Sequence, residues 1–237
     1  MRLPCLVSAL LFAASVVSAY DVITVPTANQ LKQGEIELAY YYAFLRKNDP
    51  EPEFMQIQTL YVGLTDRLEL DAHRYAIDND ETSIILIGNV KLLSEGKHGA
   101  DVVFGCKNMA GTPTVDNPPF SPVNFRQLST EQSYYLCAAK TFRLRENQGP
   151  ARPPFLRVQL GLGSPDWTIG LAKRHQGIFG GLQYVITPNV LACVFDDSRN
   201  IVTAIGYVPP KTDLMIRAGT FGADWFLGLA YLWTPRW

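Results

Sequence analysis

From residue 35 onward, apolar and polar side chains alternate along the chain with a period of two. In the segment 35–44, Ile36 and Leu38 share one parity, whereas Glu35 and Glu37 share the other. Successive side chains of a β-strand point to opposite sides, so this alternation predicts strands with one apolar and one polar face. The segment 67–76 continues the pattern after a tight turn and predicts a hairpin.

The same alternation recurs to the end of the chain and predicts twelve strands. We place them at 35–44, 55–61, 67–76, 84–90, 102–107, 134–141, 155–161, 182–186, 191–195, 201–207, 214–218 and 225–233. Every second connector along the chain is mostly a short turn, whereas the connectors between them vary more in length. This difference between the two ends is typical of transmembrane barrels. Two connectors break this rule: 143–154 is long where a turn is expected, and 221–222 is short where a loop is expected.

Alternation alone is compatible with a soluble β-sandwich, whose polar face is outside, and with a membrane barrel, whose polar face lines the lumen. Aromatic residues of the apolar parity lie near strand ends, where interfacial belts form; they are Tyr184, Trp225, Tyr231 and Trp233. We therefore predict an all-β fold: a single antiparallel up-and-down transmembrane β-barrel of about 12 strands. The polar parity, which includes Gln56 and Gln58, is then expected to face the lumen.

Residues 1–19 have the pattern of a signal peptide, which leaves 20–237 for the barrel. Arg2 precedes an apolar stretch over 6–17, and the small residues Val17 and Ala19 form a cleavage site before Tyr20. Beyond this segment no apolar run is long enough for a spanning helix, although 47% of the chain is hydrophobic and only 18% is charged. The formal net charge of -1 gives no basic excess for nucleic acid. We expect export to the bacterial outer membrane.

Several turn and strand segments resemble bacterial outer-membrane β-barrels of the YjbH-like, exopolysaccharide-associated family. They are Val25-Pro26-Thr27-Ala28 with Gly34-Glu35, the stretch Gly63-Leu64-Thr65-Asp66-Arg67-Leu68-Glu69-Leu70, and Phe179-Gly180-Gly181-Leu182-Gln183-Tyr184. The resemblance covers most of the mature chain and implies an outer-membrane barrel with a link to exopolysaccharide. Members are longer and often carry two barrels. The family's usual Glu-Tyr-Asp-Gly is replaced here by Val194-Phe195-Asp196-Asp197, which removes one lumen carboxylate.

Positively and negatively charged side chains lie at the alternate strand positions that we expect to face the lumen. The candidate lumen-lining residues are Glu37, Glu69, Asp71, His73, Lys91, Lys107, Arg157 and Arg217, and Glu35 and Lys140 share that parity. Mixed charges in a narrow lumen are compatible with a solute path and with an ion-pair lattice that plugs the barrel. For the lattice we expect Arg157 and Arg217 to meet Glu37 and Glu69 across the interior. No strong ion selectivity is expected.

No pattern of catalytic or metal-binding residues stands out, so we expect no enzyme activity, no metal and no cofactor. Ser83, Ser133 and Ser164, with His73 or His175, lie outside any recognisable hydrolase motif. The acidic stretches 78–80 and 196–197 lack the spacing of a calcium loop.

Three cysteines remain after the signal peptide, namely Cys106, Cys137 and Cys193. Their odd number and wide spacing fit neither a disulfide framework nor a metal knuckle. We interpret them as apolar thiols, with one disulfide pair as the alternative.

Two classes of function follow from this pattern. The first is an outer-membrane barrel that acts as a passive conduit or as a structural element of the envelope, linked to exopolysaccharide export by the resemblance. Its expected partners are outer-membrane lipid, polysaccharide, and the barrel-assembly machinery, which would read the C-terminal strand ending at Trp237. The alternative is an exported β-barrel that binds a ligand in a cavity and is not integral to the membrane. The longest connector, 111–131, is expected outside the cell, with both termini in the periplasm.

Overall fold

The computed structural model describes residues 27–45, 53–77, 81–96, 99–110, 114–115, 128–129, 132–144, 154–163, 177–197, 201–222 and 224–235. The predicted signal peptide (1–19) and Trp237 lie outside these residues. Within the described ranges, no helix is long and apolar enough to cross a membrane.

Fourteen strands make up the described secondary structure. They are β1 (Ile36–Leu45), β2 (Glu53–Thr65), β3 (Leu68–Ile77), β4 (Glu81–Leu93), β5 (Asp101–Lys107), β6 (Thr114–Val115), β7 (Leu128–Ser129), β8 (Ser133–Arg143), β9 (Phe155–Gly163), β10 (Gly177–Thr187), β11 (Val190–Asp196), β12 (Ile201–Tyr207), β13 (Leu214–Phe221) and β14 (Asp224–Trp233).

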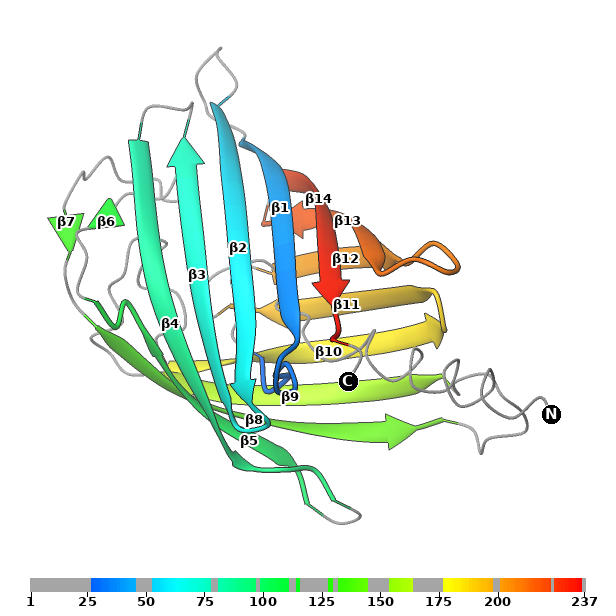
Figure 1. The fold of residues 1–237 in the computed structure, drawn as a ribbon. Coiled ribbons are helices and arrows are strands. Elements are labelled where there is room, and N and C mark those ends of the chain that lie inside the picture. The colour runs from blue at the N-terminus through cyan, green and yellow to red at the C-terminus, as the bar shows by residue number, and fades with distance from the viewer. Residues whose placement is uncertain are drawn as a thin grey trace.

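Twelve of these strands close into one antiparallel barrel (Figure 1). Each barrel strand pairs with its neighbours in the chain, except that β5 pairs with β8 across the long connector and β1 pairs with β14 to close the ring. The predicted fold class and strand number are therefore confirmed. The one addition lies within 111–131, where β6 and β7 form a separate two-stranded sheet.

Two rims bound the barrel, and we name them by the chain ends. The terminal rim is where β1 begins and β14 ends, and it carries the turn between β2 and β3. The distal rim is at the opposite end and carries the connector from β5 to β8. Since strands alternate in direction, the connectors 94–100 and 144–154 also lie at the terminal rim.

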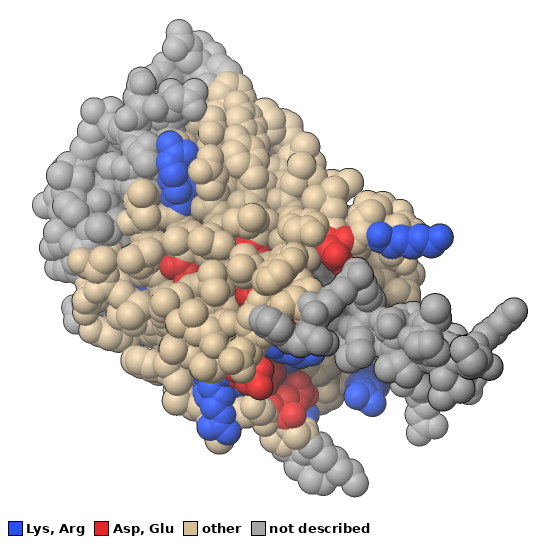
Figure 2. All heavy atoms as spheres, viewed as in Figure 1, with Lys and Arg blue, Asp and Glu red and all other residues tan. Residues whose placement is uncertain are grey.

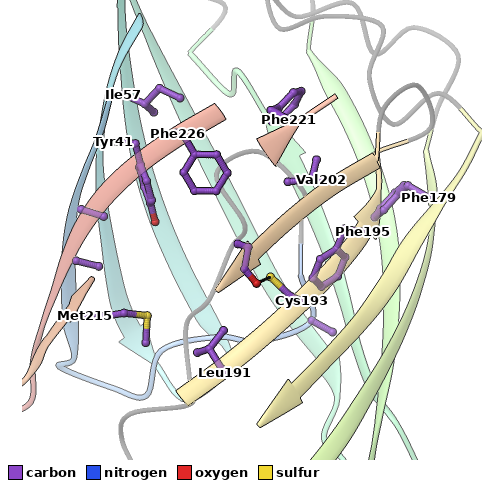
Figure 3. Close-up of a cluster of buried hydrophobic side chains, with 14 of the residues drawn as sticks. Tyr41, Ile57, Phe179, Leu191, Cys193, Phe195, Val202, Met215, Phe221 and Phe226 are labelled. Carbon is purple, nitrogen blue, oxygen red and sulfur yellow. Dashed lines mark hydrogen bonds between the residues drawn. The ribbon is translucent and has the colours of Figure 1, made fainter. Parts of the chain in front are cut away.

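The last strand shows how the alternation sorts side chains between the two surfaces. Phe226, Gly228 and Ala230 of β14 are buried, whereas Leu229 and Tyr231 are exposed. Apolar side chains also fill much of the interior, where Tyr41, Phe226, Val202 and Phe195 point inward from their strands (Figure 3). The outer surface is apolar as well, with exposed leucine, isoleucine, valine and aromatic side chains on the barrel strands.

Aromatic side chains inside the barrel lie over glycines of the neighbouring strand. In each pair a Cβ added to the glycine would run into the aromatic ring, and the two residues are partners in the strand register. The pairs are Tyr41 with Gly228, Tyr135 with Gly105, Phe179 with Gly161, Phe195 with Gly181, and Phe226 with Gly219. Large rings can thus fill the interior without forcing the strands apart.

The expected orientation of β2 and of Lys140 is wrong. Residues paired directly across two strands share a face, and Thr59 of β2 pairs with His73 of β3. The odd positions of β2 therefore face inward, and Gln56 and Gln58 lie on the outer surface. Lys140 pairs with the outward-facing Val158, so it too lies outside, where it reaches the 94–100 connector.

All three described cysteines are free. Cys137 and Cys193 are buried among the apolar residues of the interior, and the Cys193 thiol donates to the Ala204 carbonyl oxygen at 3.7 Å (Figure 3). Cys106 is half-buried on the outer face. This matches the interpretation of apolar thiols.

Candidate functional site: the barrel interior

Polar groups on the inner wall are the candidate functional site. The side chains of Glu37, Glu69, Asp71, His73, Arg157 and Arg217 are buried inside the barrel. Lys91 and Lys107 are half-buried at inward-facing register positions, opposite Val103 and Ile87. Glu35, immediately before β1, is also buried.

Arg217 forms the expected ion pair with Glu37, two strands away around the ring. The guanidinium Nη2 lies 3.4 Å from Glu37 Oε1, and both side chains are buried. Nη1 donates to the hydroxyl of Tyr41, and Nε lies 3.0 Å from the sulfur of Met215. The ion pair is therefore enclosed by further polar contacts, as a buried charge requires.

Tyr41 reaches Arg217 because Gly228 lies between them. The three residues form one register row across β1, β14 and β13, and the Tyr41 ring passes over the glycine. The row Tyr135–Gly105–Asn89 repeats this arrangement on β8, β5 and β4, where the tyrosine hydroxyl donates to Asn89 Oδ1.

Asn89 connects the second tyrosine row to the carboxylates of β3. Its amide nitrogen donates to Asp71 Oδ2 at 2.8 Å and to Glu69 Oε1 at 3.2 Å. Farther along the same face of β3, His73 Nδ1 lies 3.1 Å from the Tyr75 hydroxyl. These side chains lie along one inward face of β3, with the carboxylates toward the terminal rim.

Arg157 does not meet Glu69, which contradicts the sequence-based expectation. Its guanidinium contacts Asp101 Oδ2 at 2.7 Å and Glu95 Oε2 at 3.0 Å instead. Glu95 also accepts from the backbone N–H and hydroxyl of Thr141 at 2.7 and 2.8 Å. This cluster fastens the 94–100 connector to the terminal rim. Glu95 lies in a connector without alternation, so no sequence pattern indicated its role.

A segment ahead of β1 lies inside the barrel, which the sequence analysis did not predict. We call residues 27–33 the inner segment; Thr27, Ala28, Gln30 and Leu31 of it are buried. The Ala28 N–H donates to Gln159 Oε1 of β9 at 3.0 Å, and the Leu31 N–H donates to Glu69 Oε2 of β3 at 2.7 Å. Because β9 and β3 lie four strands apart in the ring, the inner segment crosses the interior.

Further contacts hold the inner segment at the terminal rim. The Asn29 amide nitrogen lies 3.4 Å from Gln183 Oε1 of β10. Gly63 of β2 provides the space in which the chain passes, since a Cβ there would strike the carbonyl oxygen of Lys32. The Gly34 N–H donates to the Gly63 carbonyl oxygen at 2.7 Å. Wall side chains thus satisfy the buried N–H groups of Ala28 and Leu31, as burial demands.

The described part of the interior holds no recognisable catalytic or metal-binding arrangement. No group of three or more His, Cys, Asp or Glu side chains there is placed to hold a metal ion. The ring of His73 contacts Tyr61 and Tyr75. Ser133 is buried opposite Lys107. What the arrangement does is bind its own inner segment.

No family description and no curated protein sequence matches the chain. Among solved structures, it is similar to an outer membrane channel from Pseudomonas putida F1, with 15% identity and a TM-score of 0.40 over 91% of this chain and 98% of that one. It is also similar to the N-terminal β-barrel domain of Pseudomonas aeruginosa OprF, with 13% identity and a TM-score of 0.26 over 85% and 98% of the two chains. At these values neither similarity assigns a function.

Proposed function

We propose that the protein is an integral outer-membrane barrel that serves as a structural element of the envelope, with its lumen sealed at the terminal rim by the inner segment. The observation that carries this proposal is the apolar outer surface of a closed barrel. Ile178, Leu160 and Ile205 are 69%, 62% and 62% exposed on three different strands. Soluble monomers rarely expose such a continuous apolar surface to water, whereas lipid requires one.

Aromatic side chains near both rims support placement in a bilayer. Toward the distal rim, Phe44 stacks on Trp225 with ring centroids 3.6 Å apart, and Tyr42 and Phe54 pack beside Phe44. Toward the terminal rim, Trp233 is exposed on the same strand as Trp225. The two tryptophans are eight residues apart, which is about 27 Å along the strand and about 20 Å in height at a tilt of about 40°, a little less than the apolar band of about 25 Å.

Charged groups are distributed as a membrane barrel would need them. The outer surface over β1 and β2 is largely uncharged, and most of the visible charged atoms lie toward the turns and chain ends (Figure 2). Inside the barrel, by contrast, Arg217 is paired with Glu37, Arg157 is paired with Asp101, and Asp71 accepts a hydrogen bond from Asn89.

A soluble ligand-binding barrel is the less suitable alternative. Such a barrel needs a polar exterior and a hollow interior. Here the exterior is apolar, and the interior is occupied by Tyr41, Ile57, Phe179 and Phe226 together with the inner segment.

A polysaccharide conduit is supported only by the sequence resemblance to YjbH-like barrels. A polymer could pass only if the inner segment left the terminal rim and the rings inside the barrel moved aside. We therefore propose the sealed barrel as the resting state, in which conduction requires displacement of the inner segment.

Gel mobility and conductance together test the proposal. We expect the protein in the outer-membrane fraction, with a folded band in SDS that shifts only after boiling, and no steady conductance in planar bilayers. A chain that is water-soluble without detergent would contradict membrane integration, and steady channels of the unmodified protein would contradict the seal.

A further inference from the structure

The chain ahead of β1 is fixed to the wall much more completely at one end than at the other. We call residues 27–30 the arm and residues 31–35, which lead into β1, the anchor. Each backbone N–H of the anchor donates a hydrogen bond of 2.7–3.2 Å; the acceptors are Glu69 Oε2, Glu35 Oε2, Asp66 Oδ1 and the carbonyl oxygens of Gly63 and Lys32. The anchor is therefore held firmly beside the turn between β2 and β3.

The arm has weaker contacts with the wall. The Ala28 N–H donates to Gln159 Oε1 at 3.0 Å, whereas the Asn29 amide nitrogen lies 3.4 Å from Gln183 Oε1. The backbone N–H of Asn29 donates to the hydroxyl of Thr27, which belongs to the arm itself. These contacts are longer than the strongest bonds of the anchor, and they come from side-chain amides rather than from carboxylates or the backbone of the wall.

Apolar packing differs between the two parts in the same direction. Leu31 of the anchor is buried against Tyr61, with Leu232 packed beside them. The arm contributes Ala28 to the apolar core, and that side chain is a single methyl group. Since the hydrophobic contribution scales with the apolar area removed from water, release of the arm costs much less than release of the anchor.

The arm also buries an amide that has no partner. Gln30 is 5% exposed, and neither its Oε1 nor its Nε2 has a hydrogen bond within the described part of the chain. On the wall, the Nε2 of Gln183 is also buried without a partner among these residues. An amide that loses water without gaining a partner costs free energy, which is recovered when the amide returns to water. The closed position of the arm is thus weakened by its own side chain.

We propose that the arm is a reversible closure of the lumen, which leaves the wall by local opening while the anchor stays bound, and that the buried Gln30 amide keeps this closed state marginally stable. The inference rests on the proposed sealed barrel and adds how its seal opens. Local opening requires little free energy where few contacts break. Opening of the arm breaks the contacts with Gln159 and Gln183 and returns the Gln30 amide to water.

Labelling of a cysteine at position 28 by a water-soluble maleimide tests the proposal, in a background without the three native cysteines. Ala28 is fully buried, and Ala28→Cys is a small change that keeps the backbone N–H bonded to Gln159. When the arm closes faster than the reagent reacts, the labelling rate follows the population of the open state. The reporter therefore measures how stable the closed arm is.

Gln30→Met should slow the labelling of position 28 about tenfold, because it keeps the length of the side chain and removes the unpaired amide. Gln33→Met makes the same chemical change at an exposed position of the inner segment and keeps the N–H that donates to Asp66. It is the matched control, and we expect it to leave the rate unchanged. The boiling-dependent gel shift verifies that each protein is folded, and Gln30→Leu takes the place of Gln30→Met if that variant lacks the folded band.

Several outcomes would overturn the proposal in a barrel that remains sealed. Labelling of the Gln30→Met protein as fast as that of the parent, an equal slowing by Gln33→Met, or loss of the folded band in both Gln30 variants would show that the amide does not weaken the closed state. Equal rates for cysteines at positions 28 and 31 would show that arm and anchor leave together.

Failure of the sealed barrel itself has a different signature. A cysteine at position 28 that reacts as fast as one at the exposed position 33, together with steady conductance of the unmodified protein, would contradict the seal whatever the effect of Gln30→Met.

Discussion

At the scale of single residues, the interior is packed by aromatic rings that lie over glycines of the neighbouring strand. The Tyr41–Gly228 and Tyr135–Gly105 pairs each let a hydroxyl reach the next strand, to Arg217 in one row and Asn89 in the other. The glycines thus determine which polar groups can meet. The sequence does not reveal these pairs, because the ring over each glycine, such as Gly161 or Gly181, comes from a neighbouring strand whose register is not readable in advance.

Gly228→Ala should destabilise the barrel, because the added Cβ would lie within the space of the Tyr41 ring. Overpacking of this kind costs about 1–3 kcal/mol. The loss of stability is measured as the urea concentration at which half of the protein no longer runs as the folded gel band. Gly96→Ala is the matched control, since no atom lies within 4 Å of its added Cβ. Identical midpoints for the two variants would show that the ring moves aside freely.

Arg217→Met should cost about 3–5 kcal/mol of unfolding free energy, because it leaves the buried Glu37 carboxylate without its cation. The double variant Arg217→Met/Glu37→Gln removes both charges and should recover most of the loss. Denaturant titration of all three proteins measures the coupling. Additive losses in the double variant would mean that the ion pair contributes little.

At the scale of elements, the inner segment is the part of the fold that sequence could not reveal. The strands were predictable because alternation is a local signal, and all twelve barrel strands coincide with predicted segments. The inner segment has no periodicity, and its contacts lie 38 residues away at Glu69 and 131 residues away at Gln159. The contacts of Glu95 and Asp101 with Arg157 were not predicted for the same reason, since Arg157 lies more than fifty residues later in the chain.

Gly63→Val should release the inner segment, because a side chain at this position would collide with the backbone of Lys32. A cysteine at position 31, where Leu31 is 1% exposed, reports the release in a background without the three native cysteines. We expect slow labelling by a water-soluble maleimide in the parent and at least about tenfold faster labelling with Gly63→Val. Gly96→Ala in the same background should leave the rate unchanged. Equal rates in all three proteins would mean that the segment does not depend on Gly63.

At the scale of the whole molecule, the two rims predict an orientation. The chain ends and the β2–β3 turn lie at the terminal rim, and the connector from β5 to β8 lies at the distal rim. If the terminal rim faces the periplasm, protease added to intact cells should cut within 111–131. Cleavage that appears only after the outer membrane is opened would reverse this orientation.

The central claim is that the apolar outer surface contacts lipid, and a spin-label scan along β14 tests it most directly. Single cysteines at 225–233, in a protein without native cysteines and reconstituted in lipid, report access to oxygen and to a polar nickel chelate. We predict high oxygen access and low chelate access at 225, 227, 229, 231 and 233, with low access to both reagents at the even positions 226 and 230. High chelate access at 227, 229 and 231, in the middle of the strand, would contradict a lipid-facing outer surface.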